Sequence, residues 1–118
     1  MKKILCGGCF NKIHKGHVYF LKQCKSLGKL NVVVSNDVIN RHKYKEQAVS
    51  AETRKKNIEK LKIADKVVIG NKDNRLKTVR DIQPDIICLG YDQKLEKNIL
   101  EHCKKNKIKL KRIHKLSL

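Results

Sequence analysis

The chain has 118 residues, 40% of them hydrophobic, and carries 29 lysines and arginines against 11 acidic residues, giving a formal net charge of +18. The lysines are spread over every predicted element and lack the aromatic partners that stack bases, which argues against a dedicated nucleic-acid-binding protein. The apolar runs are too short to span a membrane, and no hydrophobic signal region follows the basic N-terminus, so we expect one cytoplasmic domain covering residues 1–118.

The N-terminal third of the chain predicts two strands joined by a loop and a helix. Residues 3–10 form the first strand, and residues 15–27 have apolar side chains at helical spacing, with Gly28 as the predicted helix C-cap. The apolar run at 32–34 predicts a short buried strand. The polar stretch 37–49 has no clear periodicity and predicts no element.

The remainder of the chain alternates helices with strands. Ser50 is the predicted N-cap of a helix over 51–62. The later elements are a strand at 67–69, a helix at 74–82 that stops before Pro84, a strand at 85–89, a helix at 92–106 packed through Leu95, Ile99, Leu100 and Cys103, and a strand at 108–113. Apolar strands alternating with helices predict an α/β fold, a single Rossmann-like domain whose five-stranded parallel sheet is covered on both faces.

The loop between the first strand and the first helix, Gly8 to His17, is the most informative stretch of the sequence. His14 and His17 lie three residues apart where the helix begins, so they share a helical face and point toward the same spot. Free backbone N–H groups and the positive end of the helix dipole favour an anion there. The loop therefore predicts a site for the phosphates of a nucleotide.

Other polar residues follow the later strands at the same edge of the sheet. In open parallel sheets, ligands bind beyond the carboxyl ends of the strands. Asp37 follows the second strand and Arg112 closes the last, while the fourth strand is followed by Gly90, Tyr91, Asp92 and Gln93. This convergence supports a single ligand site at that edge.

The Gly8–His17 segment resembles the GTFDxxHxGH signature of the cytidylyltransferase-like nucleotidyltransferases, with Cys9 and Asn11 in place of threonine and aspartate. The resemblance extends over nearly the whole chain. Its further elements are Lys43, Lys45 and Arg54, at the spacing of the family's phosphate-binding lysines and arginine, residues 84–93, which are similar to its fourth-strand segment, and Arg112, similar to the arginine before its last helix.

The resemblance implies nucleotidyl transfer, in which a phosphorylated acceptor attacks the α-phosphate of a nucleoside triphosphate and pyrophosphate leaves. His14 and His17 would stabilise the phosphates in the transition state, and Lys43 and Lys45 would neutralise the pyrophosphate or the acceptor phosphate. Mg²⁺ would arrive on the triphosphate, without a dedicated set of protein ligands. The implied nucleotide-binding residues are Gly7, Gly8, Cys9, Phe10, Asn11, Gly16, Arg54, Gly90, Asp92, Gln93 and Arg112.

The substrates stay open between two alternatives. Overall spacing is similar to that of glycerol-3-phosphate cytidylyltransferases, which favours CMP transfer from CTP to a phosphorylated small molecule such as glycerol-3-phosphate. Residues 89–93 and 112–113 look more like archaeal FAD synthases, which transfer AMP from ATP to FMN. The family's last helix has no counterpart after Arg112, so a homodimer that completes the site and a non-catalytic nucleotide- or RNA-binding module are also considered.

The cysteines do not predict a second chemistry. Five cysteines, an odd number, argue against a secreted disulfide framework. Cys6 and Cys9 form a CxxC pair, but Cys6 belongs to the first strand, whereas a catalytic pair begins at a helix N-terminus. We therefore expect reduced thiols without a redox or zinc site.

Overall fold

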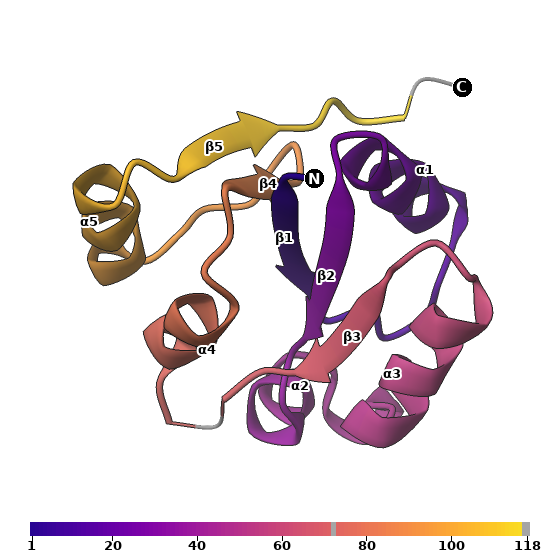
Figure 1. Cartoon of the computed structure of the whole chain (residues 1–118). Helices are drawn as coiled ribbons and strands as arrows, with labels where there is room; N and C mark the ends of the chain where they lie inside the picture. The colour runs from indigo at the N-terminus through magenta and orange to yellow at the C-terminus, as the bar shows by residue number, and fades with distance from the viewer. Residues whose placement is uncertain (72, 117–118) are drawn as a thin grey trace.

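The computed structural model describes residues 1–71 and 73–116, which build one five-stranded sheet in the order β3-β2-β1-β4-β5 with every neighbouring pair parallel (Figure 1). No helix in these ranges is long and apolar enough to span a membrane. The elements are β1 Lys3–Gly8, α1 Lys15–Lys25, β2 Lys29–Val34, α2 Asp37–Tyr44, the 3₁₀ turn η1 Lys45–Gln47, α3 Ala51–Lys60, β3 Lys66–Ile69, α4 Arg75–Ile82, β4 Ile86–Leu89, α5 Lys97–Lys105 and β5 Lys109–Arg112.

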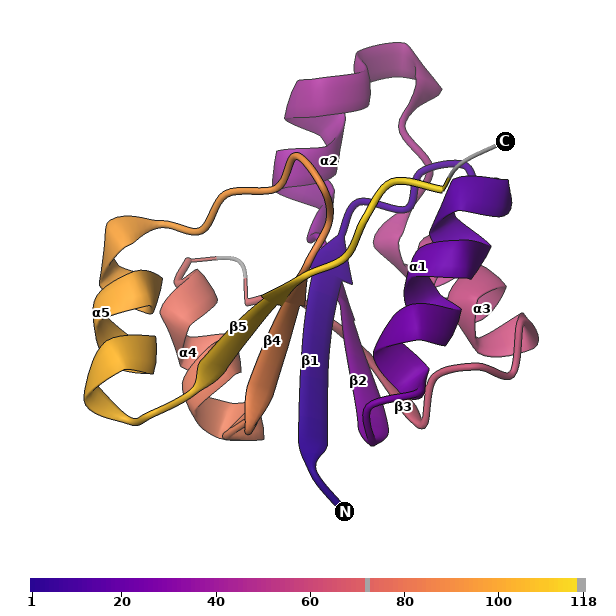
Figure 2. The same cartoon turned by 90° about the horizontal axis from the view of Figure 1, so that it is seen from above.

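Alternation along the central strand divides the core into two layers. Ile4 and Cys6 of β1 pack with residues of α1 and α3, whereas Leu5 packs with residues of α4 and α5. Figure 2 shows these two helix pairs on opposite sides of the sheet, with α2 beyond its end. The predicted α/β fold, with a parallel five-stranded sheet covered on both faces, is confirmed.

The strand order reverses direction at the centre of the sheet. From β1 the chain moves outward through β2 to β3, then crosses back to β4 and continues to β5 on the other side. Adjacent crossovers therefore leave β1 and β4 in opposite directions, which opens a crevice between the loops at their carboxyl ends. This is the edge at which the predicted site residues converge.

The stretch 37–49, for which the sequence predicts no element, forms α2 and η1. Asn36 caps α2 by accepting a hydrogen bond from the Ile39 N–H at 3.1 Å. The one fully buried residue of α2 is a polar one, Asn40, so this helix lacks the apolar stripe that periodicity detects. Farther on, the predicted cap is confirmed, because the Ser50 Oγ accepts from the Thr53 N–H at the start of α3.

The predicted helix over 92–106 is too long at its N-terminus. The helix α5 begins at Lys97, and the preceding residues form a loop that turns at Gly90, where the Gln93 N–H donates to the Gly90 carbonyl at 3.2 Å. Leu100, a predicted packing residue, is 41% exposed. The apolar pattern of this segment therefore overstates both the length of the helix and its buried face.

The last strand, β5, forms an open edge of the sheet. Its residues Lys109 to Arg112 are all exposed, and three of these four are basic. Its backbone pairs on one side with β4, in the register Ile86–Lys109 to Leu89–Arg112.

Gly28 does not cap α1 as predicted. The C-cap is Ser26, and no glycine in the described chain has a positive φ. Gly28 is instead required by close packing, because a Cβ at this position would lie 2.3 Å from the Lys2 carbonyl oxygen. That oxygen accepts a hydrogen bond from the Lys29 N–H, so the contact lies where β1 and β2 begin to pair.

We expect Gly28→Ala to lower the free energy of unfolding by about 1–3 kcal/mol, because the new methyl group must push two paired backbones apart. Urea unfolding measures this loss. Gly90→Ala is the control, since its added Cβ would find no atom closer than 3.8 Å and should leave the midpoint nearly unchanged. Equal midpoints for the two variants would contradict the packing role of Gly28.

Candidate active site

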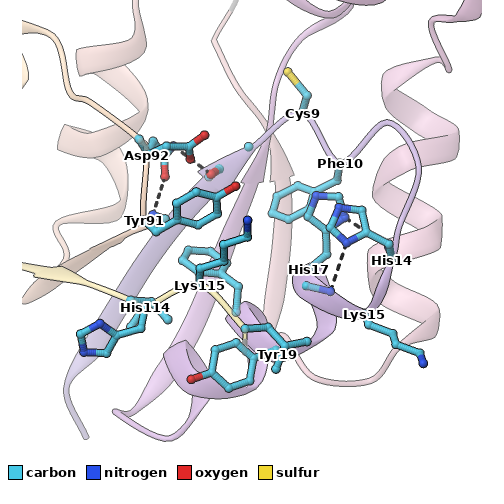
Figure 3. A pocket seen from close by; sticks show the side chains of 18 of the residues that line it. Cys9, Phe10, His14, Lys15, His17, Tyr19, Tyr91, Asp92, His114 and Lys115 are labelled. Carbon is cyan, nitrogen blue, oxygen red and sulfur yellow. Dashed lines mark hydrogen bonds between the residues drawn. The ribbon is translucent and has the colours of Figure 1, made fainter. Parts of the chain in front are cut away.

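A cavity with a volume of about 750 Å³ opens at the carboxyl ends of β1, β4 and β5. Its walls are the loop after β1, the first turns of α1, the end of α2, the loop after β4 and the tail after β5 (Figure 3). Most predicted site residues line it: Gly7, Gly8, Cys9, Phe10, His14, Gly16, His17, Lys43, Gly90, Asp92 and Gln93. Four others lie outside its lining, namely Asn11, Lys45, Arg54 and Arg112.

The side chains of His14 and His17 together cap the N-terminus of α1. The Nδ1 of His14 accepts a hydrogen bond from the Gly16 N–H at 3.1 Å, and the Nδ1 of His17 accepts one from the His14 N–H at 3.3 Å. Their rings stack with centroids 3.8 Å apart. A Cβ on Gly16 would lie 2.9 Å from the His14 ring, so glycine is needed between them. Imidazole nitrogens thus form a reciprocal capping box, a task usually performed by hydroxyl and carboxyl groups.

This capping assigns the proton on each ring. A neutral imidazole has one accepting nitrogen and one N–H. Because each Nδ1 accepts from the backbone, the proton of the neutral ring is assigned to Nε2 in both histidines. In this tautomer each ring has its Nε2–H as donor at a helix N-terminus, where the helix dipole also favours negative charge. In their neutral form the two rings can thus contribute hydrogen bonds to an anion.

The surroundings of His17 favour the neutral ring. Burial, and next the neighbouring His14, lower the pKa of His17 below its usual value of 6.5, with the Lys12 backbone acting in the opposite sense. His17 is therefore neutral at pH 7. Protonation at lower pH would occupy the Nδ1 that receives the His14 N–H and would remove this half of the cap.

The cavity is basic. Lys15, Lys43 and Lys115 line it, together with His114, whereas Asp92 is its one carboxylate among the residues that the structure describes. Opposed cations in a concave site attract a multiply charged anion from solution. The lining is therefore suited to a polyphosphate.

The loop after β4 is held rigidly against the loop after β1. The Gln93 side chain accepts from the Gly90 N–H and donates to the Gly7 carbonyl, both at 3.1 Å. The Arg112 Nη1 donates to the carbonyls of Gly90 and Gln93 at 2.7 and 2.8 Å. Both predicted ligand-binding residues thus contact the backbone of this loop, and Arg112 supports the cavity wall from outside the cavity lining.

Arg54 is fully buried and does not reach the cavity, so the structure does not support its predicted role as a phosphate ligand. Its Nε donates to the Val49 carbonyl, and its Nη1 donates to the Cys9 carbonyl, each at 2.8 Å. The same Nη1 lies 3.2 Å from the Ser35 hydroxyl, and the Nη2 lies 3.6 Å from an Asp37 carboxylate oxygen. The guanidinium fork therefore joins the segments that follow β1, β2 and α2.

Asn11 extends this buried network and also lies outside the cavity lining. Its Oδ1 accepts from the Val49 N–H at 2.8 Å and from the Asn40 side chain at 3.0 Å, and its Nδ2 donates to the Gln47 carbonyl. Lys45, the second predicted lysine, is exposed and forms the C-cap of α2. Of the two lysines, the structure brings Lys43 to the cavity.

A second cavity, with a volume of about 300 Å³, lies between β1, α2, α4 and α5. It shares part of its lining with the larger one, namely Gly7, Gly8, Cys9, Lys43 and Gln93. Its other walls combine the apolar residues Leu5, Val33, Ile39, Val79, Ile87, Leu89, Leu95 and Ile99 with the polar and charged residues Ser35, Asn36, Asn71, Arg75, Thr78, Lys94 and Glu96. Two chambers thus meet at the tip of β1.

Several cavity residues have no catalytic or binding role assigned from the sequence, although the sequence does place Tyr91 at this edge of the sheet. They are Lys15, Tyr19, Phe20, Tyr44, Tyr91, Ile113, His114, Lys115 and Leu116. Tyr91 follows β4 and the tail follows β5, and residues that follow parallel strands lie at the edge of the sheet where ligands bind. Their positions in the sequence therefore place them at this edge. The path of the tail across to α1, by contrast, is a tertiary feature without a local pattern.

The cysteines are free thiols, and Cys6, Cys24 and Cys88 are buried in the core. A hydrogen bond between the side chains of Cys24 and Cys6 raises the pKa of the Cys24 thiol well above its usual range. These three buried thiols pack in the core. Among the described residues, no three histidine, cysteine or acidic side chains gather in a way that could hold a metal ion.

Comparison of the sequence with known proteins identifies the family of this chain. Residues 5–115 match the family described as cytidylyltransferase-like. Proteins named FAD synthase from Aciduliprofundum boonei, Methanosarcina mazei and Thermoplasma acidophilum are 45%, 39% and 39% identical to this chain. The matches cover 94%, 86% and 81% of this chain and 76%, 67% and 68% of those proteins.

Two solved structures are also similar. One is described as a lipopolysaccharide core biosynthesis protein from Thermoplasma volcanium, with a TM-score of 0.82, 34% identity and coverage of 100% of this chain and 98% of that one. The other is a pantoate-beta-alanine ligase from Francisella tularensis, with a TM-score of 0.58, 15% identity and coverage of 96% and 58%. The second likeness extends to the fold alone.

We expect the His17 ring to titrate below pH 6.5 in an NMR titration of its carbon-bound protons. Since the unfolded chain then binds more protons than the folded one, His17 should make its full contribution to stability above pH 6.5 and lose it as the pH falls through its lowered pKa. His14→Asn keeps a capping acceptor and removes the neighbouring charge, so it should raise this pKa partway. A midpoint at or above 6.5 in the wild type would contradict the assignment.

We expect Arg54→Lys to lower the free energy of unfolding by about 2–4 kcal/mol, because an ammonium cannot replace the buried fork and leaves carbonyls without donors. Chemical denaturation measures this loss, and Lys56→Ala, an exposed position in the same helix, is the control. Unchanged stability combined with lost nucleotide affinity would instead indicate that Arg54 binds a ligand directly.

Proposed function

The chain belongs to the cytidylyltransferase-like family and is a nucleotidyltransferase, and from this membership we propose that it is an FAD synthase, which transfers AMP from ATP to FMN. The observation that carries the proposal is its 37–45% identity, over most of its length, to proteins named FAD synthase. These relatives support FMN and ATP better than the glycerol-3-phosphate and CTP that the sequence favours.

In the proposed reaction, a phosphate oxygen of FMN attacks the α-phosphorus of ATP. The new P–O bond forms as the bond to the bridging oxygen of the β-phosphate breaks, so the products are FAD and pyrophosphate. Negative charge builds up on the oxygens around the α-phosphorus and on the leaving group. Donors that are fixed before the reaction stabilise that charge without reorganising.

His14 and His17 are the proposed catalytic donors. Their capping bonds hold both rings in place, and their Nε2–H groups would donate to phosphate oxygens. Because His17 is neutral at pH 7, it would stabilise the transition state by hydrogen bonding and would not transfer a proton. Lys43 lines both cavities and would contact the phosphates on either side of the reacting centre.

The second cavity is the proposed site of the flavin. The apolar residues among its walls would pack against a flat aromatic ring system, whereas a glycerol moiety would leave them in contact with water. The residues that it shares with the larger cavity, Gly7, Gly8 and Cys9 among them, would then lie beside the two phosphates that react.

A divalent cation, Mg²⁺ by preference, would bind together with the triphosphate. The donor set fits this arrangement, because one carboxylate, Asp92, lines the cavity beside several basic groups, and Mg²⁺ takes phosphate oxygens and waters readily. The ion would neutralise charge on the triphosphate, with Asp92 as the available protein ligand.

We expect the protein to form FAD and pyrophosphate from ATP and FMN in the presence of Mg²⁺, as followed by chromatography. His14→Asn retains a helix-capping side chain but loses the Nε2–H, so kcat should fall about 10²–10³-fold. The affinity for ATP should change by less than about tenfold. His102→Ala, on the distant helix α5, is the control.

Turnover of CTP with glycerol-3-phosphate, with none of ATP with FMN, would overturn the proposed substrates while keeping the enzyme class. Full activity of His14→Asn would overturn the proposed catalytic role of the histidine pair.

A further inference from the structure

The tail after β5 forms one wall of the large cavity. It is anchored at Ile113, which is buried and donates its N–H to the Leu89 carbonyl at 2.8 Å. Beyond this anchor the tail crosses the end of the sheet toward α1 (Figure 2). Its residues 114–116 line the cavity together with His14 and His17, which belong to the opposite end of the sequence.

Lys115 is the lysine of the tail, and its positively charged side chain lines the cavity. Figure 3 shows its amine pointing into the cavity alongside Tyr91, and the Nζ lies 5.4 Å from the centroid of the Tyr91 ring. Within residues 1–71 and 73–116, no carboxylate lies within 4.0 Å of the Lys115 amine, even though Asp92 lines the same cavity. An ammonium held only by an aromatic face remains available to a stronger anionic partner.

The position of Lys115 complements the helix N-terminus. The histidine pair would offer ring N–H donors from one wall, and Lys115 offers a full positive charge from the wall formed by the tail. A nucleoside triphosphate bound at the start of α1 would carry several negative charges into the space between these walls. A lysine there gains far more from a triphosphate than from a monophosphate.

We propose that Lys115 is a triphosphate-binding residue of this enzyme and that Tyr91 positions its side chain. The inference rests on the proposed nucleotidyl transfer and assigns to the tail a contact that the sequence does not predict. Contact with the Tyr91 ring would hold the Lys115 amine at the cavity, so that nucleotide binding does not have to order a free side chain.

The test is isothermal titration of the full chain with ATP, AMP and adenosine, with Mg²⁺ present. Lys115→Ala should weaken ATP binding about tenfold, AMP binding less and adenosine binding by under about twofold. Lys115→Arg should retain most of the ATP affinity. Lys111→Ala is the matched control, because it removes an equal charge from the exposed strand β5 outside the cavity lining. Tyr91→Leu should weaken ATP binding by a smaller factor than Lys115→Ala.

Equal losses for Lys115→Ala and Lys111→Ala would indicate general electrostatic attraction and overturn the inference. An unchanged ATP affinity of Lys115→Ala, with wild-type binding intact, would overturn it while leaving the proposed function standing. If the wild type binds CTP and not ATP, FAD synthesis fails as the function, and the same comparison with CTP, CMP and cytidine decides the role of Lys115.

Discussion

The buried guanidinium of Arg54 is the interaction on which the candidate site depends. It contacts the carbonyls of Cys9 and Val49 and the hydroxyl of Ser35, and it lies beside the Asp37 carboxylate. These groups belong to the segments that follow β1, β2 and α2. A planar group with five donors joins them in one plane, which an ammonium cannot do. The loop that presents His14 and the helix that presents Lys43 are thereby fixed relative to each other.

In the proposed mechanism, each histidine has two separate tasks, one for each ring nitrogen. The Nδ1 atoms complete the first turn of α1, and the Nε2 atoms would contact the ligand. Folding of the helix therefore orients the proposed catalytic groups, and the capping bonds also select the tautomer. The position of the His14 ring in this cap also explains why a glycine separates the two histidines, since a side chain at position 16 would collide with that ring.

Local patterns in the sequence predict the layers of the fold and most of the cavity lining, because the strands predicted at 3–10, 67–69 and 85–89 are short and largely apolar and a glycine lies at or near the end of each. What they cannot predict depends on tertiary burial. Arg54 has the spacing of a phosphate ligand, and only the packing of α3 against the loop after β1 turns it inward. The helix α2 escapes detection because its buried residue is Asn40, and Lys115 because nothing local specifies where the tail crosses.

The exposed basic residues of β5 have a consequence for the behaviour of the protein at high concentration. A free strand edge is a template for pairing with another chain, and proteins commonly protect such edges with charge. Lys109, Lys111 and Arg112 would face their own counterparts if two copies aligned along β5. That repulsion weakens as salt screens it, so aggregation by sheet extension should be suppressed most strongly in dilute buffer.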